Sequence, residues 1–166
     1  MISLPIYLQV YGYNIVRLKN NDSYILLNDL KYNNDLLEST AASSSDELIS
    51  LLTIILSAIF MSGGVMQESS LNEYLKTFHI ELGSRSPHPV FGNVDKLIHQ
   101  DWARQCYLEI ILDKMMDPPK REYKWGERAH LEFPKKWMLE LVCKVYGDDI
   151  QPEMWTAQWK QVQDNP

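Results

Sequence analysis

Cysteine is scarce in this sequence, in which Cys106 and Cys143 are the two among 166 residues. A cysteine-rich zinc site needs several thiolates at short spacing, and a disulfide framework needs several cysteine pairs. The scarcity therefore argues against both kinds of scaffold. We expect two buried, reduced thiols, as is usual in an intracellular protein.

Long hydrophobic runs are missing as well. The longest apolar stretch, "LISLLTIILSAIFM" at Leu48–Met61, has 14 residues, whereas a membrane-spanning helix needs roughly 20. It predicts a buried core helix and no membrane contact. The opening residues "MISLPIYLQV" carry neither a basic start nor a small-residue cleavage site, so no secretory signal is expected.

Positive charge is in deficit, because the formal net charge is -6 and the isoelectric point is near 5.2. Proteins that coat nucleic acids over their whole surface are basic, so this balance argues against such a role. Any nucleic-acid contact must come from a local patch.

Motifs for catalysis are also lacking. We expect no helix-spaced pair of carboxylate and histidine around His79, His88, His99 or His130, and the sequence has no G-x-S-x-G motif and no P-loop. The prediction is a protein that is not an enzyme and holds neither a metal nor a cofactor.

Apolar and aromatic residues are plentiful, with 45% hydrophobic residues, five Trp and nine Tyr. This is enough for a core in one domain or in two small ones. Alternating residues in "YNIVRLKNNDSYILLNDL" predict a β-hairpin with its turn at residues 20–22. The polar, aperiodic stretch that follows predicts a boundary, with a linker at residues 39–45.

Helical periodicity then governs residues 46–104. The first helix is expected at residues 46–61, with Ser45 as its N-cap and Gly63 and Gly64 as its stop. A capping box at Ser70 predicts a second helix, with the buried residues Leu71, Tyr74, Leu75 and Phe78. The third is expected from about residue 93 to residue 104.

The period changes from 3.6 to 2 at Cys106, which predicts a strand at residues 106–112. The prolines at 118 and 119 predict a turn, and residues 121–125 a returning strand. Three helices followed by a two-stranded hairpin is the order of a winged helix. A last long helix is expected at residues 134–146, and a short one in the tail.

The predicted fold class is thus α+β and mainly helical, a tandem winged helix whose first module is reduced to its C-terminal hairpin. Its expected parts are the hairpin remnant at residues 1–38, the linker at 39–45, the second winged helix at 46–150 and the tail at 151–166. We expect Trp125, at the end of the returning strand, to belong to the core.

Two surfaces are candidates for binding. The last helix carries more apolar residues than one buried stripe needs, with Leu139 between the core positions. Either a partner or the wing and tail of this chain covers that surplus. The partner-binding candidates are Trp137, Met138, Leu139, Leu141 and Val142.

Winged helices usually present the third helix and the wing to nucleic acids. Residues 113–136 hold seven Lys or Arg and five Asp or Glu, a local net charge of +2, which predicts weak, non-specific binding or none. The candidates are Lys96, Arg104, Lys120, Arg121, Lys124, Arg128, Lys135 and Lys136.

Three segments carry a resemblance to a known family: "LLTIILSAIFMSGG", "FGNVDKLIHQDWARQCYLEI" and "DPPKREYKWGERAHLE". They resemble the second winged helix of the melanoma-antigen (MAGE) homology domain, with Phe91-Gly92 before the third helix, Tyr107 to Glu109 in a strand, and a Trp-Gly-x-Arg-Ala signature beginning at Trp125. The hairpin "YGYNIVRL" to "SYILLNDL" is similar to the end of the family's first winged helix.

The resemblance is strongest to the MAGE-type subunit of the SMC five/six complex, which maintains chromosomes and repairs DNA. It implies a nuclear, non-catalytic adaptor that binds a kleisin subunit, a RING-type ubiquitin ligase subunit and DNA. The family's leading helices, which carry much of the RING contact, have no counterpart in this sequence. The alternatives are a stand-alone winged-helix DNA-binding protein and a RING-ligase adaptor of the tumour-antigen kind.

Overall fold

The structure is a computed structural model that describes residues 12–18, 24–28, 44–84, 86–115, 119–147 and 149–164. The chain divides into two compact units, Met1–Ser43 and Ser44–Pro166. Within the described residues, no helix combines the length and the apolar composition that crossing a bilayer requires.

The first unit contains an antiparallel hairpin of β1 (Tyr13–Arg17) and β2 (Tyr24–Asn28). The register pairs Ile15 with Leu26 and Val16 with Ile25, so the predicted hairpin is confirmed. The expected turn at residues 20–22 lies outside the described residues. Residues 39–43 of the expected linker also lie outside them.

Helix α2 (Ser44–Met61) opens the second unit. It begins two residues before the predicted start, so Ser45 lies inside the helix and is not its N-cap. The predicted stop is confirmed, since Gly63 and Gly64 have φ of 90° and 95°. The Gly64 amide donates to the carbonyl of Ile59 over 2.9 Å, which satisfies one of the last helical carbonyls.

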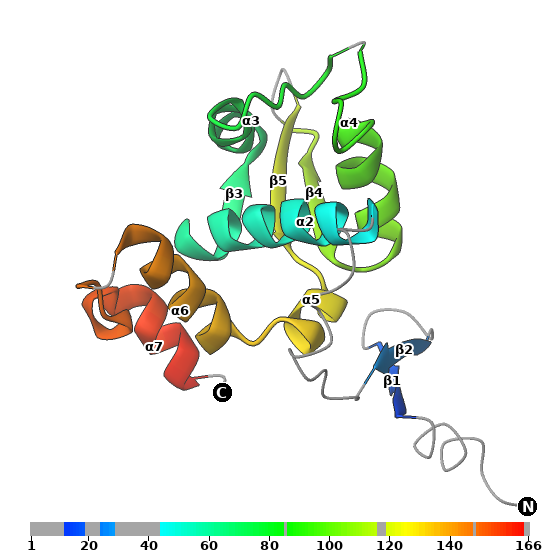
Figure 1. The fold of residues 1–166 in the computed structure, drawn as a ribbon. Coiled ribbons are helices and arrows are strands. Elements are labelled where there is room, and N and C mark those ends of the chain that lie inside the picture. Colours follow the sequence, from blue (N-terminus) through cyan, green and yellow to red (C-terminus); the bar gives the residue numbers. More distant parts are fainter. Residues whose placement is uncertain are drawn as a thin grey trace, which may run out of the picture. The chain divides into compact units, whose positions relative to one another are not determined.

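A three-stranded antiparallel sheet lies against α2, in the order β3-β5-β4 (Figure 1). Strands β4 (Leu108–Asp113) and β5 (Lys120–Trp125) are the predicted wing. Strand β3 (Val65–Gln67) was not expected, because three residues are too few for a visible alternation. Cys106 was predicted to begin the strand β4. It lies instead in the preceding turn, where its φ is 63°. Residues 117 and 118 of the predicted turn lie outside the described residues.

The second and third helices flank the upper end of the sheet (Figure 1). Helix α3 (Glu68–Lys76) begins before the predicted capping box, with Gln67 at the N-cap position. Its buried residues are Leu71 and Leu75, whereas Phe78 lies beyond the helix and is exposed, against expectation. The third helix is α4 (Val94–Lys96) continued by the π-helical η2 (Leu97–Trp102), as predicted in position.

Four short or medium helical elements complete the unit: α5 (Glu127–Glu132), α6 (Lys135–Tyr146), η3 (Pro152–Met154) and α7 (Thr156–Asp164). The sequence predicted α6 and a helix in the tail but missed α5. Helix α7 packs beside α6 (Figure 1). The side chain of Gln158 donates to the carbonyl of Met61 over 2.9 Å, which ties α7 to the C-terminal end of α2.

One hydrophobic core joins the helices and strands of the second unit, apart from η3, which contributes no buried residue. Fully buried side chains come from α2, α3, η2, β5 and α6, including Ile55, Leu71, Ile98, Tyr123 and Met138. The order of helices and strands, with the sheet and wing in place, confirms the winged helix predicted for this part of the chain.

Candidate partner-binding surfaces

Helix α6 buries more of its surface than a single stripe. It packs against α2 on one side and against α7 and η3 on the other. Met138 and Leu139 are both 0% exposed. The expectation that Leu139 lies on a free surface between core positions is therefore wrong, because α7 and η3 of the tail cover a second side of α6. Met138 and Val142 are core residues as well.

A different stripe of α6 faces solvent. Trp137 is 45% exposed and Val145 is 78% exposed, and the partly buried Leu141 lies between them in sequence. We call Trp137, Leu141 and Val145 the outer stripe; they follow each other at four-residue spacing, which keeps them along one side of a helix.

The outer stripe continues into an aromatic series at its N-terminal end. The ring of Trp137 lies 6.4 Å from that of Phe133, which lies 6.2 Å from that of Tyr107. The Tyr107 hydroxyl donates to Glu132, and burial, followed by that bond, raises the pKa of Tyr107. The three aromatic side chains are therefore uncharged, and Tyr107 is held in place by its hydrogen bond to Glu132.

The Trp-Gly-x-Arg-Ala signature is structural. The Trp125 indole donates to the carbonyl of Leu56 over 2.8 Å, and Trp125 is buried as predicted. Gly126 lies so close to the turn at Cys106 that a Cβ would come within 2.2 Å of the Cys106 carbonyl oxygen. Ala129 is fully buried.

Arg128 completes the signature. Its Nε donates to Glu132 over 2.8 Å, and its guanidinium lies 4.8 Å from the ring centroid of Tyr107. The side chain thus links α5 to the start of β4. Partial burial lowers the pKa of Arg128, but the hydrogen bond to Glu132 and the attraction of its carboxylate outweigh this effect, so the pKa of Arg128 is raised.

The basic residues expected to touch nucleic acid lie on several elements. Three of them are engaged with carboxylates, in the pairs Arg104–Asp101 at 2.9 Å, Arg121–Glu68 at 2.7 Å and Arg128–Glu132 at 2.8 Å. The others lie on α4, β5 and α6; they are Lys96, Lys120, Lys124, Lys135 and Lys136.

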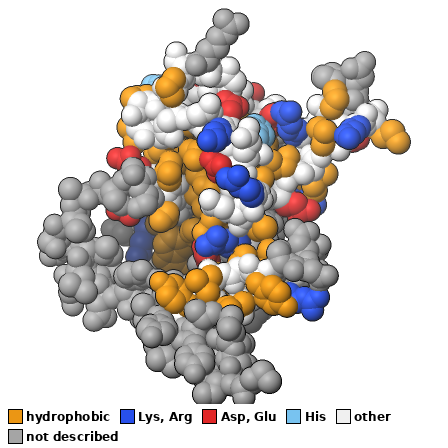
Figure 2. Space-filling view, turned by 90° about the vertical axis from the view of Figure 1, so that its right-hand side faces the viewer, with side chains coloured by type: hydrophobic (Ala, Val, Ile, Leu, Met, Phe, Trp, Pro, Cys, Tyr) orange, Lys and Arg blue, Asp and Glu red, His pale blue; other side chains and the backbone are white. Residues whose placement is uncertain are grey.

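Two of these lysines sit opposite acids in the wing. Lys120 pairs in register with Asp113, and Lys124 with Glu109. On the face drawn in Figure 2, basic and acidic side chains are interspersed with apolar ones and form no single patch. The structure thus places many of the predicted cations close to acidic side chains.

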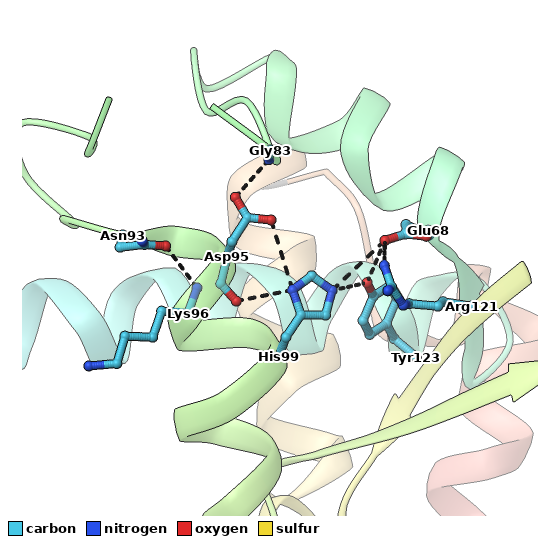
Figure 3. Close-up of polar contacts among 8 residues, drawn as sticks. All are labelled: Glu68, Gly83, Asn93, Asp95, Lys96, His99, Arg121 and Tyr123. Carbon is cyan, nitrogen blue, oxygen red and sulfur yellow. Dashed lines mark hydrogen bonds and ion pairs between the residues drawn. The ribbon is translucent and has the colours of Figure 1, made fainter. Parts of the chain in front are cut away.

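A polar cluster joins the third helix to the wing, and the sequence analysis missed it. His99, on η2, lies between Asp95 of α4 and Tyr123 of β5, with Glu68 of α3 and Arg121 beyond Tyr123 (Figure 3). The imidazole Nδ1 lies 3.0 Å from the Asp95 carbonyl oxygen, and Nε2 lies 2.7 Å from the Tyr123 hydroxyl.

The expectation that no carboxylate and histidine share helical spacing is also wrong. Asp95 and His99 are four residues apart, and the Asp95 carboxylate oxygen lies 3.8 Å from Nδ1. This spacing was the signal that could have revealed the cluster. Desolvation by burial, followed by the nearby Glu68, raises the pKa of Tyr123.

No group of three or more histidine, cysteine or acidic side chains among the described residues could hold a metal ion. The polar cluster contains one imidazole and carboxylates already engaged by Arg121 or by the Gly83 amide, which donates to Asp95 over 2.6 Å. Its geometry is that of a structural network.

The family model of the MAGE homology domain matches residues 9–136 of this chain. The chain is 34% identical over 154 residues to the "Non-structural maintenance of chromosomes element 3 homolog" of Homo sapiens, covering 90% of this chain and 48% of that protein. The homologue from Mus musculus is also 34% identical, with 90% and 52% covered. The chain thus spans about half the length of these relatives.

Two further comparisons agree. "Melanoma-associated antigen D2" of Homo sapiens is 32% identical over 154 residues, covering 92% of this chain and 24% of that protein. A solved chain of an "Nse1-Nse3-Nse4 complex" superposes with a TM-score of 0.85 at 34% identity, covering 96% of this chain and 75% of that chain. The resemblance seen in the sequence is confirmed, and this chain belongs to the MAGE homology domain family.

Proposed function

We propose that this chain is a non-catalytic scaffold subunit of an SMC-type chromosome-maintenance complex, in the place that Nse3 holds in the Nse1-Nse3-Nse4 assembly. The similarity in fold and sequence to a chain of that assembly carries the proposal. The names of the human and mouse homologues support it. A subunit with this role acts in the nucleus.

The kleisin subunit is the proposed partner of the outer stripe. Trp137 and Leu141 belong to the apolar set expected from the sequence, and with Val145 they offer a stripe that the described part of this chain leaves uncovered or half covered. An amphipathic helix recognises such a surface through residues at helical spacing. An exposed tryptophan is a common anchor of such interfaces.

The test is co-purification of the full chain with the kleisin subunit. We expect Trp137→Ala and Leu141→Arg each to lose the partner, because one removes the anchor and the other places a charge in an apolar contact. The matched control is Lys144→Ala, an exposed position of the same helix. Thermal unfolding should show all three variants folded; retained capture by both stripe variants would reject this site.

A RING-type subunit is the second proposed partner, since the matched assembly has three components. Mixing this chain with the kleisin and RING subunits should give one complex on size-exclusion chromatography. A RING subunit that binds only when a longer form of this protein is used would place its contact outside residues 1–166.

Weak, non-specific DNA contact is an additional proposal. The observation that favours it is the exposure of Lys96 on the third helix and of Lys120 on the wing, the two elements that winged helices present to DNA. Phosphate contacts of this kind add affinity without reading sequence.

A further inference from the structure

The distances in the polar cluster around His99 determine which of its atoms donate and which accept hydrogen bonds. A backbone carbonyl can only accept a hydrogen bond, so the 3.0 Å contact with Asp95 requires a proton on Nδ1 of His99. In the neutral imidazole, Nε2 then has no proton. It must accept from the Tyr123 hydroxyl, which lies 2.7 Å away.

The single hydroxyl proton of Tyr123 cannot serve two acceptors at once. Besides His99 Nε2, the Glu68 carboxylate lies 3.5 Å from the same hydroxyl oxygen. While neutral His99 accepts the hydrogen bond from this hydroxyl, Glu68 keeps the hydrogen bond that Arg121 donates over 2.7 Å. The cluster is then divided into a half on the third helix and a half on α3.

We propose that protonation of His99 reverses the Tyr123 hydroxyl and joins the two halves. The imidazolium Nε2–H donates to the Tyr123 oxygen, and the Tyr123 hydroxyl turns to Glu68. A single chain of hydrogen bonds then runs from the third helix across β5 to α3 (Figure 3). The step moves one proton onto His99 from solvent and breaks no covalent bond.

Charged groups lie on both sides of the imidazole. The carboxylates of Glu68 and Asp95 each have an oxygen 3.8 Å from one of its nitrogens. Arg121 opposes them, although its guanidinium is bonded to Glu68. The cleft beside the cluster is completed by uncharged side chains, from α3, the following loop and β4: Asn72, Leu82, Ile110 and Leu112.

The switch would change how firmly the third helix is fixed to the rest of the fold. While His99 is neutral, its hydrogen bond with Tyr123 connects the third helix to β5 but not to α3. In the protonated state, the same helix is also coupled to the first turn of α3 through Glu68. The inference does not depend on the proposed function, because it concerns the fixation of one helix within the fold.

A double-mutant cycle on the full chain tests the switch. Tyr123→Phe keeps the buried ring and removes the hydroxyl, and Glu68→Ala removes the acceptor. Unfolding by denaturant at about pH 8 should show no coupling between the two changes, whereas at about pH 5 the coupling should reach about tenfold in the folding equilibrium constant. Equal coupling at both pH values would overturn the proposal.

Two controls make the result specific. The same cycle in a His99→Gln background should lose its pH dependence, because glutamine gains no proton. In the unaltered chain, nitrogen-15 NMR of the imidazole should show the Nδ1–H tautomer in the neutral form. The Nε2–H tautomer, or a cycle that stays pH-dependent without His99, would also overturn the proposal.

Discussion

At Gly126 two backbone segments come close together. A Cβ there would lie 2.2 Å from the carbonyl oxygen and 2.6 Å from the carbonyl carbon of Cys106. Its φ of -78° is ordinary, so lack of space, and not backbone conformation, requires glycine. The glycine of the family signature therefore has a packing explanation.

Gly126→Ala should destabilise the protein by about 1–3 kcal/mol, the usual cost of forcing extra volume into a packed site. Denaturant unfolding monitored by tryptophan fluorescence measures it. Ser62→Ala, at an exposed turn, should change stability by no more than about 0.5 kcal/mol. Equal effects of the two variants would show that the turn at Cys106 can move away.

We expect His130 to make the stability of the fold sensitive to acid, although the residue retains exposed surface. Its ring lies 5.4 Å from that of Trp125. Partial burial, followed by the nearby Lys135, lowers the pKa of His130. The unfolded chain therefore binds this proton more readily than the folded one, and the contribution of the neutral ring is lost as the pH falls below about 6.5.

We predict that the free energy of unfolding of His130→Gln falls less between about pH 7.5 and pH 5.5 than that of the unaltered chain. Chemical denaturation at a series of pH values gives both curves. Ser62→Ala, at an exposed position without a titratable group, is the control and should leave the pH dependence unchanged. A steeper loss in His130→Gln would contradict the assignment.

At the scale of elements, α6 has two apolar stripes with different roles. One contains Met138, Leu139, Val142 and Cys143 and is buried between α2 and the tail. The other is the outer stripe of Trp137, Leu141 and Val145. A substitution on the buried stripe therefore tests stability, whereas one on the outer stripe tests the proposed partner binding.

Leu139→Arg is expected to unfold the second unit, since a charge without a partner would be placed in a site that is 0% exposed. The cost should exceed about 3 kcal/mol. Circular dichroism would show the loss of helix, and partner capture would fail with it. A folded Leu139→Arg variant that only loses the partner would return this residue to the binding surface.

At the scale of the whole molecule, net charge and charge placement limit contact with DNA. The chain carries a net charge of -6, and several of its cations are engaged with acids. We expect duplex DNA to bind with a dissociation constant of about 1–100 μM at physiological salt, without sequence preference.

Fluorescence anisotropy at several salt concentrations measures this. The logarithm of the binding constant falls linearly with the logarithm of the salt concentration. Lys96→Ala and Lys120→Ala should each reduce the steepness of this line by about 1, whereas Lys144→Ala, on a different element, should not. Binding well below 1 μM would instead favour the stand-alone DNA-binding alternative.

The sequence determined the elements whose signals are local. Apolar spacing and paired glycines identified α2 and its end, and period-two alternation identified β1, β4 and β5. The same residues carried the resemblance to the MAGE family. The short elements β3 and α5 escaped, because three and six residues hold too little of either period.

Only the tertiary structure decided which apolar residues of α6 are free and what His99 contacts. The tail reaches α2 from 97 residues away through Gln158, and Tyr123 reaches His99 from 24 residues away. A hydrophobic pattern tells how apolar a helix face is, but burial depends on which distant segment lies against it. That pairing is set by packing of the whole unit, so no local spacing could reveal it.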